Sequence, residues 1–221
     1  MDAPRRTLNF AEKPPEEMLR CARQFRRAMQ QRRTTRDFSD RPVPHTLIEE
    51  ALIAAGSAPS GANLQPWHFV VVSDAKTKKE IRTAAEEEER LFYQQRAPAE
   101  WLDALRPLGL DANKPFLEIA PYLIAIFLKK YTVCPEQKNR KNYYTCESVG
   151  IAAGILIAAL HLAGLSSLVH TPSPMKFLNK ILKRPTNGRP YLVLVVGYPR
   201  PDATVPDIAR QPFDAIATFI E

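Results

Sequence analysis

The longest hydrophobic stretch of the chain lies in its second half, between Thr145 and Gly164. From Val149 to Leu160 it has no polar side chain, so a helix formed here would be apolar on every face. Such a helix belongs inside a protein. The run without polar side chains, Val149 to Leu160, is shorter than the about 20 apolar residues that a bilayer span needs. Thr145 is positioned to cap its start, and Gly164 offers the left-handed residue that ends it. The pattern therefore predicts a core helix.

Small residues recur along this predicted helix at Gly150, Gly154 and Ala158. The four-residue spacing places them in one row, against which another backbone can pack closely. Two interpretations follow from this stretch alone. The helix is either a plain core helix, or it is buried twice, by its own domain and by an identical partner chain.

Four shorter hydrophobic runs predict strands. They cover residues 69–72, 122–128, 165–169 and 191–196. Residues 132–140 between the second strand and the central helix read as a polar loop. Because strands and helices mix without strict βαβ alternation, the sequence predicts an α+β fold, which we assign to one domain over 1–221.

Two helices are predicted before the first strand. Apolar residues recur on one stripe over 15–31, which is typical of an amphipathic helix. Thr46 and Glu49 form a capping box for a second helix, which ends near Ala55.

Two further helices are predicted from their start signals. Asp74 opens a charged helix that continues to about Arg96. Ser173 followed by Pro174 predicts another helix, since serine is a favoured N-cap and proline a favoured first residue.

The pattern becomes irregular between residues 97 and 113. Its apolar anchors are Trp101, Leu102, Leu105 and Leu108. Such a segment inside a compact domain is either a poorly packed excursion or a functional lid. We expect an active-site lid over about 86–114, and a proline-punctuated, extended C-terminal arm over about 200–221.

The composition is that of a soluble globular protein, with 45% hydrophobic and 25% charged residues among 221. The sequence shows no signal peptide and no membrane-spanning run, and its three cysteines are widely spaced. We therefore expect a cytoplasmic protein with reduced thiols and without a membrane anchor.

The net charge of +7 is concentrated at the N-terminus. Residues 1–36 hold ten basic side chains against four acidic ones, a net of +6. A basic helix could attract nucleic acid or anionic lipid. No pattern of an RNA-binding module accompanies it, so a solvated face is favoured and no nucleic-acid partner is expected.

Several kinds of chemistry have no motif in the sequence. It contains neither a Rossmann fingerprint nor a P-loop, and its four histidines lack metal-ligand spacing. No serine or cysteine stands in a recognisable nucleophile motif. Two segments instead suit an anionic ligand: RRTTR at 32–36, with three guanidinium groups, and the small-residue loop at 56–63. From the residues alone, the chain is an α+β dimer candidate that binds an anion.

Four segments, taken in order, resemble the flavin-dependent nitroreductase superfamily. They are RRTTRDFS, APSGANLQPWHFVVV, ESVGIAAGILIAAL and VGYP. The resemblance implies a central, mostly antiparallel sheet flanked by helices, with FMN as cofactor. It also implies an intertwined homodimer with exchanged C-terminal arms and two FMN sites at the subunit interface.

The resemblance carries the family's flavin ligands onto nine residues of this sequence. They are Arg32, Arg33, Thr34, Thr35, Arg36, Ser60, His170, Thr171 and Arg210. It further implies that Thr171 hydrogen-bonds flavin N5 and favours single-electron steps. The backbone amide of Ala62 matches the position that meets the substrate phenolate. No metal is implied.

Within the superfamily, the closest resemblance is to the iodotyrosine deiodinases. That subgroup's lid carries a Glu, a Tyr four residues later and a Lys, here Glu89, Tyr93 and Lys114. A halotyrosine zwitterion presents an ammonium and a carboxylate close together. Glu89 can accept from the ammonium, while Tyr93 and Lys114 can donate to the carboxylate. Binding would order the lid and exclude water.

The resemblance implies FMN-dependent reductive dehalogenation of 3-iodotyrosine and other halotyrosines to tyrosine and halide, with an unidentified electron donor. Two alternatives stay open. One is an NAD(P)H-dependent reductase of nitroaromatics or quinones, and the other is a non-catalytic flavin- or anion-binding protein.

Overall fold

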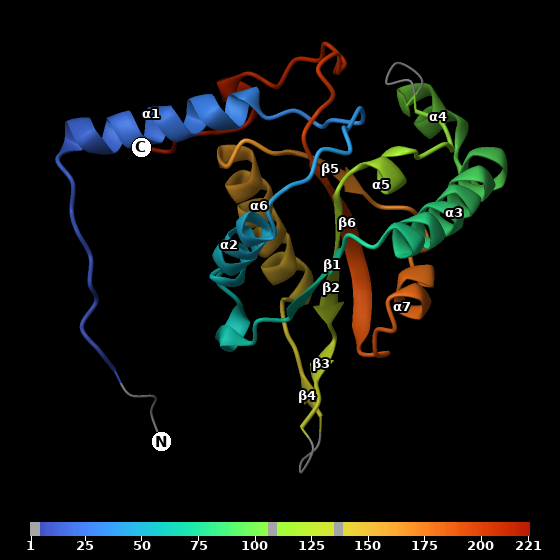
Figure 1. Ribbon diagram of the computed structural model, residues 1–221. Helices are drawn as coiled ribbons and strands as arrows, with labels where there is room; N and C mark the ends of the chain where they lie inside the picture. Colours follow the sequence, from blue (N-terminus) through green and yellow to red (C-terminus); the bar gives the residue numbers. More distant parts are fainter. Residues whose placement is uncertain (1–4, 106–109, 135–138) are drawn as a thin grey trace. The chain divides into compact units, whose positions relative to one another are not determined.

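The computed structural model describes residues 5–105, 110–134 and 139–221 (Figure 1). By its internal contacts the chain divides into two compact units, Met1–Arg32 and Arg33–Glu221. The first unit holds helix α1, and the second holds the strands and the other helices.

Helix α1 spans Pro15–Gln31, the boundaries that the apolar stripe predicted. Proline opens the helix at a position where no intrahelical N–H is needed, and Glu16 and Glu17 lie in the first turn, where the helix dipole favours negative charge. None of its residues is buried, and Met18 and Phe25 are 55% and 53% exposed. This helix therefore keeps an uncovered apolar stripe.

The second unit is built on a four-stranded sheet in the order β1-β2-β6-β5. The strands are β1 (Trp67–Val72), β2 (Tyr122–Lys129), β6 (Gly188–Gly197) and β5 (Ser166–His170). Every neighbouring pair is antiparallel. The four hydrophobic runs thus form the predicted strands, and the α+β class is confirmed.

Strand β2 is buried on both faces, and its side chains alternate between two cores. Ile124 and Ile126 belong to one hydrophobic cluster, while Leu123, Ala125 and Phe127 belong to the other. A run without polar residues is what a strand covered on both faces requires, because successive side chains point to opposite sides.

Helices cover both faces of the sheet (Figure 1). The first cluster packs α2 (His45–Gly56) and α6 (Thr145–Leu162) on one face. The second cluster packs α3 (Ala75–Leu91), α5 (Phe116–Ile119) and α7 (Phe177–Ile181) on the other. The sheet therefore lies between two helical layers.

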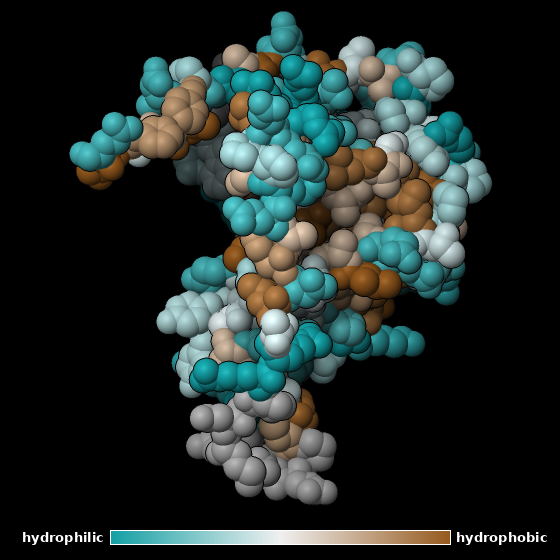
Figure 2. Space-filling view, turned by 90° about the vertical axis from the view of Figure 1, so that its left-hand side faces the viewer, coloured by the Kyte–Doolittle hydropathy of each residue, from teal (hydrophilic) through white to brown (hydrophobic). Residues whose placement is uncertain are grey.

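The predicted core helix is α6, and it is buried on one side only. Six of its residues are buried, but Ile151 and Leu162 remain 46% and 58% exposed. Hydrophobic side chains reach the surface on the side of the molecule that carries α2 and α6 (Figure 2). By length and composition alone, α6 is also long and apolar enough to cross a membrane, which is weak evidence for a single helix. Its buried apolar residues pack in the hydrophobic cluster against the sheet, as in a core helix. Within one chain, α6 is therefore not a plain core helix covered on every face, and its burial by a second copy of the chain stays a prediction.

The ends of α6 meet the predictions in part. Gly164 has φ +84° and ends the helix as expected. Thr145 is not the N-cap: that position belongs to Tyr144, in the left-handed region at φ 49°. Because Thr145 already lies inside the helix, its hydroxyl does not cap the first turn, and Ser148 Oγ donates to the Tyr144 carbonyl at 2.7 Å.

Asp74 does cap α3, since its carboxylate accepts the Thr77 N–H at 2.7 Å. The other two predicted starts are wrong. Helix α2 begins one residue before Thr46, after Pro44, without a side-chain cap. Helix α7 begins only at Phe177, and the Ser173 carbonyl instead accepts from Arg96 Nη1 at 3.0 Å.

The segment predicted as irregular contains a helix. A π-helical turn, η2 (Phe92–Arg96), ends the α3 region, and α4 (Ala99–Leu105) follows it. The Pro98 carbonyl accepts from the amides of Trp101 and Leu102 in the first turn of α4. The predicted anchor Leu108 lies outside the described residues.

The remaining segments are short. The predicted polar loop is flanked by two short paired strands, β3 (Tyr131–Thr132) and β4 (Arg140–Lys141), and its residues 135–138 lie outside the described part of the chain. The small-residue loop forms a 3-10 turn, η1 (Gly61–Asn63), and the extended C-terminal arm contains another, η4 (Phe213–Ala215).

Candidate functional site

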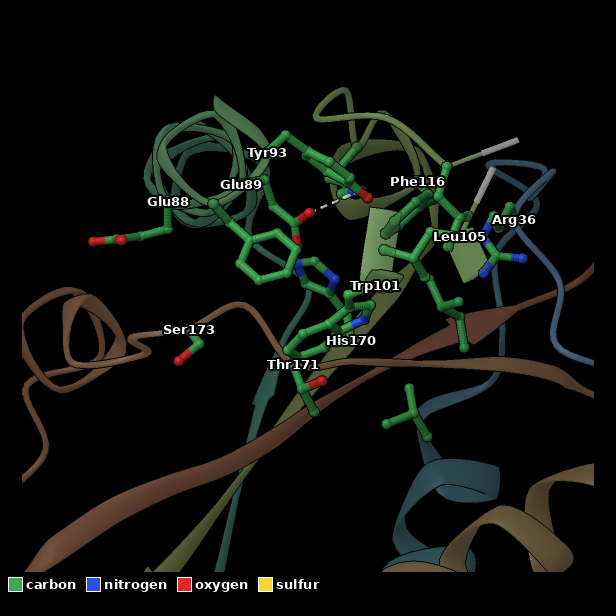
Figure 3. A pocket seen from close by; sticks show the side chains of 15 residues that line it. Arg36, Glu88, Glu89, Tyr93, Trp101, Leu105, Phe116, His170, Thr171 and Ser173 are labelled. Carbon is green, nitrogen blue, oxygen red and sulfur yellow. Dashed lines mark ion pairs between the residues drawn. The ribbon is translucent and has the colours of Figure 1, made fainter. Parts of the chain in front are cut away.

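A cavity of about 220 Å³ lies between the α3 layer and the end of β5 (Figure 3). Glu89 and Tyr93 reach it from α3 and η2, Lys114 from the chain just before α5, and Arg36 from the segment after α1. Thr171 follows β5 and lines the same cavity. Side chains far apart in the sequence thus meet in one place.

The charged centre of the cavity is an ion pair between Glu89 and Lys114. Glu89 Oε2 lies 3.3 Å from Lys114 Nζ, and the two side chains are only 15% and 8% exposed (Figure 3). Tyr93 lies one helical turn after Glu89, so both share one face, and its ring centroid is 5.7 Å from Lys114 Nζ. Burial raises the pKa of Tyr93, and Glu89 and Asp111 raise it further, while Arg36 opposes them. Tyr93 therefore stays a neutral hydrogen-bond donor at pH 7.

Lys114 is fixed from both its backbone and its side chain. Its N–H donates to Glu86 Oε1 at 2.8 Å, and its ammonium donates to the Asp111 carbonyl. The side chain is thereby directed toward Glu89 and Tyr93.

Arg36 is placed by pairing of its segment with the edge of the sheet. Thr34 forms a parallel bridge with Ser167, and Thr35 N–H donates to the Ser167 carbonyl at 3.4 Å. The segment thus follows β5, and Arg36 reaches the cavity near its end. Burial lowers the pKa of Arg36, against the opposing effects of Tyr93 and Asp37. Within the described residues, its guanidinium has no hydrogen bond or ion pair.

His170 forms part of the cavity wall in an apolar setting. It is 7% exposed, and the Phe116 ring lies edge-on at 5.8 Å. Burial lowers the pKa of His170 to about 3, and the charge of Lys114 adds to this effect. The imidazole is therefore neutral at pH 7, and its Nε2 atom has no partner among the described residues.

Comparison with known proteins assigns the family. The model of the nitroreductase family matches residues 29–198. The chain belongs to the nitroreductase family. The nitroreductase-like α+β fold expected from the sequence is thereby confirmed.

The relatives of this nitroreductase-family chain include iodotyrosine deiodinases. One from Haliscomenobacter hydrossis is 55% identical over 201 residues, covering 91% of this chain and 90% of that protein. Human iodotyrosine deiodinase 1 is 40% identical over 210 residues, covering 94% and 72%. A crystal structure of oxidised iodotyrosine deiodinase bound to FMN and 3-iodo-L-tyrosine is 34% identical with a TM-score of 0.74, covering 88% of this chain and all of that one.

Six of the residues proposed from the sequence line this same cavity. They are Arg36, Glu89, Tyr93, Lys114, His170 and Thr171. Ser60 and Ala62 do not line it. Ser60 Oγ accepts the Gln65 N–H at 3.0 Å, and Ala62 is exposed with φ 49°, in the left-handed region. Residues from the segment predicted as a lid and from the end of β5 thus line one cavity, whereas the Ser60 loop lies elsewhere on the same chain.

The other proposed flavin residues lie outside the cavity lining. Arg32 ends α1 in the first unit, and Thr34 and Thr35 pair with β5. The Arg33 guanidinium donates to the Pro206 carbonyl in the C-terminal arm, where Arg210 is exposed.

Aromatic residues that were not proposed as site residues from the sequence also shape the cavity. Trp101 from α4 packs edge-on to Phe92 at 5.0 Å, and Phe116 closes the side next to His170. The helical spacing of Trp101, Leu102 and Leu105 in AEWLDAL is the signal that would have indicated α4.

The hydrogen-bond donors and the apolar walls of the cavity suit a flat, anionic cofactor. Arg36 offers a planar guanidinium for phosphate, and the neutral imidazole of His170 offers a nitrogen without a partner in the described chain. Apolar and aromatic walls beside these donors suit a ring system. The residues present therefore fit FMN.

Proposed function

We propose that the protein catalyses FMN-dependent reductive dehalogenation of 3-iodotyrosine and related halotyrosines, giving tyrosine and halide. The observation that carries this proposal is the buried Glu89–Lys114 pair with Tyr93 in the same cavity as Arg36 and Thr171. The relatives that act on iodotyrosine, at 55% and 40% identity, support it.

The lid pair matches the amino-acid end of the substrate. Glu89 and Lys114 neutralise each other in the cavity, so a zwitterion can replace each partner with a group of the same sign. The substrate ammonium would then bind Glu89, and its carboxylate would bind Lys114 and the Tyr93 hydroxyl. The exchange conserves charge, which limits the cost of opening a buried ion pair.

FMN, when bound and reduced by an electron donor, would supply the two electrons that, with one proton, replace the carbon–iodine bond by a carbon–hydrogen bond and release iodide. Arg36, with Arg32, Arg33, Thr34 and Thr35, would hold the phosphate end of the cofactor. The Thr171 hydroxyl would donate a hydrogen bond to flavin N5, and His170 and Arg210 would complete the cofactor's contacts.

The site is proposed to form between two copies of the chain in a homodimer. The cavity of about 220 Å³ in one chain is smaller than the about 300–1,000 Å³ typical of ligand pockets, so one chain supplies only part of it. Ser60 and Ala62 would reach the site from the second copy, with the Ala62 amide donating to the substrate phenolate.

Two features of the single chain support that dimer. Ile151 and Leu162 leave an apolar stripe on α6, beside the small residue Gly154. The arm 200–221 ends in exposed hydrophobic side chains, Phe219 and Ile220 among them. A partner chain would cover both. Together the two copies of 1–221 form a cytoplasmic enzyme in this proposal.

Titration of the oxidised flavin's fluorescence with 3-iodotyrosine tests the proposal. We expect saturable quenching, much weaker binding of 2-iodophenol, which lacks the zwitterion, and iodide release under reducing conditions. Lys114→Gln and Glu89→Gln should each weaken iodotyrosine binding about tenfold or more, since a charge-assisted hydrogen bond contributes about 1.5–3 kcal/mol. Equal affinity of the wild type for the two ligands would refute this use of the lid. If this protein reduces nitroaromatics but binds no halotyrosine, the proposed dehalogenase function is wrong.

A further inference from the structure

Arg82 on α3 joins three parts of the structure outside the cavity. Its Nε donates to Glu86 Oε1 at 2.7 Å, its Nη1 to Glu118 Oε2 at 2.8 Å, and its Nη2 to Asn113 Oδ1 at 2.9 Å. Glu86 lies on the same helix, Asn113 directly precedes Lys114, and Glu118 belongs to α5. One guanidinium therefore fastens the chain on both sides of Lys114 to α3.

Glu86 extends this connection to the backbone of Lys114 itself. Its Oε1 atom accepts both from Arg82 and from the Lys114 N–H at 2.8 Å. The side chains of Arg82 and Glu86 are 27% and 17% exposed, so water screens the network only in part. Burial alone would raise the pKa of Glu86, but the bonds from Arg82 and Lys114 outweigh it and leave that pKa below its ordinary value.

The network also decides which carboxylate meets the Lys114 ammonium. Glu86 and Glu89 are three residues apart on α3 and so are neighbours on the helix surface. With Arg82 bonded to Glu86, that carboxylate is neutralised and turned to the backbone of Lys114. Glu89 remains the partner of Lys114 Nζ inside the cavity.

We propose that Arg82 is a positioning residue for recognition of the substrate's amino-acid group, because it clamps residues 113–118 to α3 and so holds Lys114 beside Glu89. The inference rests on the proposed function, since it concerns how the lid reads a zwitterion. Arg82 does not line the cavity and is not a catalytic residue. Lysine cannot replace it fully, because one ammonium lacks the planar fork that reaches three acceptors at once.

The test compares ligand discrimination in Arg82→Gln, Arg82→Lys and a matched control. Arg90→Gln is the control, because Arg90 lies on the same helix and pairs with Glu87 of that helix. Arg82→Gln should lower iodotyrosine affinity about tenfold while 2-iodophenol affinity changes less than about twofold, and Arg82→Lys should fall between it and wild type. Arg90→Gln should match the wild type for both ligands. A wild-type discrimination ratio in Arg82→Gln, or equal losses for both ligands, would overturn the inference.

Hydrogen exchange provides a readout that needs no substrate. In the flavin-loaded protein, the Lys114 amide should exchange faster in Arg82→Gln than in wild type or Arg90→Gln, because its acceptor is no longer held. If the Lys114 amide exchanges at the same rate in Arg82→Gln and in wild type, the proposed positioning role of Arg82 is wrong, even if iodotyrosine binds. If the wild type binds no iodotyrosine but the Lys114 amide still exchanges faster in Arg82→Gln, the proposed function is wrong. In that case the result still supports the role of Arg82 in holding residues 113–118 to α3.

If Arg82→Gln does not fold, Asn113→Ala takes its place. That change removes only the Arg82 Nη2 bond and should reduce the iodotyrosine-to-iodophenol discrimination about two- to threefold. An unchanged ratio in Asn113→Ala would overturn the inference.

Discussion

Lowering the pH from 8 to 5 should destabilise the folded protein through His170. The imidazole has a pKa of about 3 in the folded chain, against its ordinary 6.5, because burial and the nearby Lys114 charge disfavour protonation. Below pH 6.5 the unfolded chain binds a proton that the folded chain does not. Unfolding is therefore favoured increasingly as the pH falls, until the pH approaches the folded value.

The size of the effect follows from the two pKa values. Each pH unit inside the window from 6.5 down to about 3 costs at most about 1.4 kcal/mol of unfolding free energy. Between pH 8 and pH 5 this one site should remove about 2 kcal/mol. For a protein of ordinary stability, that is a large share of the total.

The assay is urea unfolding of wild type and His170→Gln at pH 8 and pH 5, with protein and flavin concentrations held equal. Glutamine does not titrate, so the variant should lose about 2 kcal/mol less than wild type between the two pH values. Lys114→Gln should also reduce the loss, because it removes the charge that opposes protonation of His170. The same pH dependence in wild type and His170→Gln would refute the reasoning.

Three further predictions concern the proposed site and dimer. Arg36→Ala should weaken FMN retention by about 1.5–3 kcal/mol, measured by flavin fluorescence, whereas unchanged retention would remove Arg36 from the phosphate site. A Cβ atom at Gly154 would meet nothing within 4 Å in its own chain, so a joint loss of dimer and flavin in Gly154→Leu, measured by sedimentation, would come from overpacking against the partner, and a yellow monomer would contradict the shared site. Thr171→Ala should lower deiodination while nitroaromatic reduction and the melting temperature are kept, because Thr171 is exposed in the single chain, and Thr171→Ser should restore the rate. Parallel loss of both activities would contradict the assigned role.

Periodicity predicted the elements of this fold better than their ends. Helix α1 and the four strands follow from apolar spacing. The strands are covered on their faces, whereas the apolar stripe that predicted α1 is uncovered in the single chain. The caps predicted at Thr46 and Thr145 failed for a local reason. Capping depends on the backbone angles of the preceding residues, here Pro44 and a left-handed Tyr144, and single-residue preferences do not report those angles.

The candidate site was predictable where a motif carried it. Glu89 and Tyr93 share a helix face by their spacing, but nothing in the residues alone brings Lys114 to them across the intervening segment. Only the resemblance did so. Arg82 was missed because an arginine on a charged helix looks like a solvated side chain, and its three acceptors come from separate elements.

The pairing of Thr34 with Ser167 has a consequence for handling the protein. Strand β5 is the last strand of the sheet, and a free strand edge invites pairing with other chains. The segment that covers this edge is the one proposed to hold the FMN phosphate. Flavin loss should therefore loosen the cover and promote aggregation, so that added FMN would act as a solubilising agent during expression and storage.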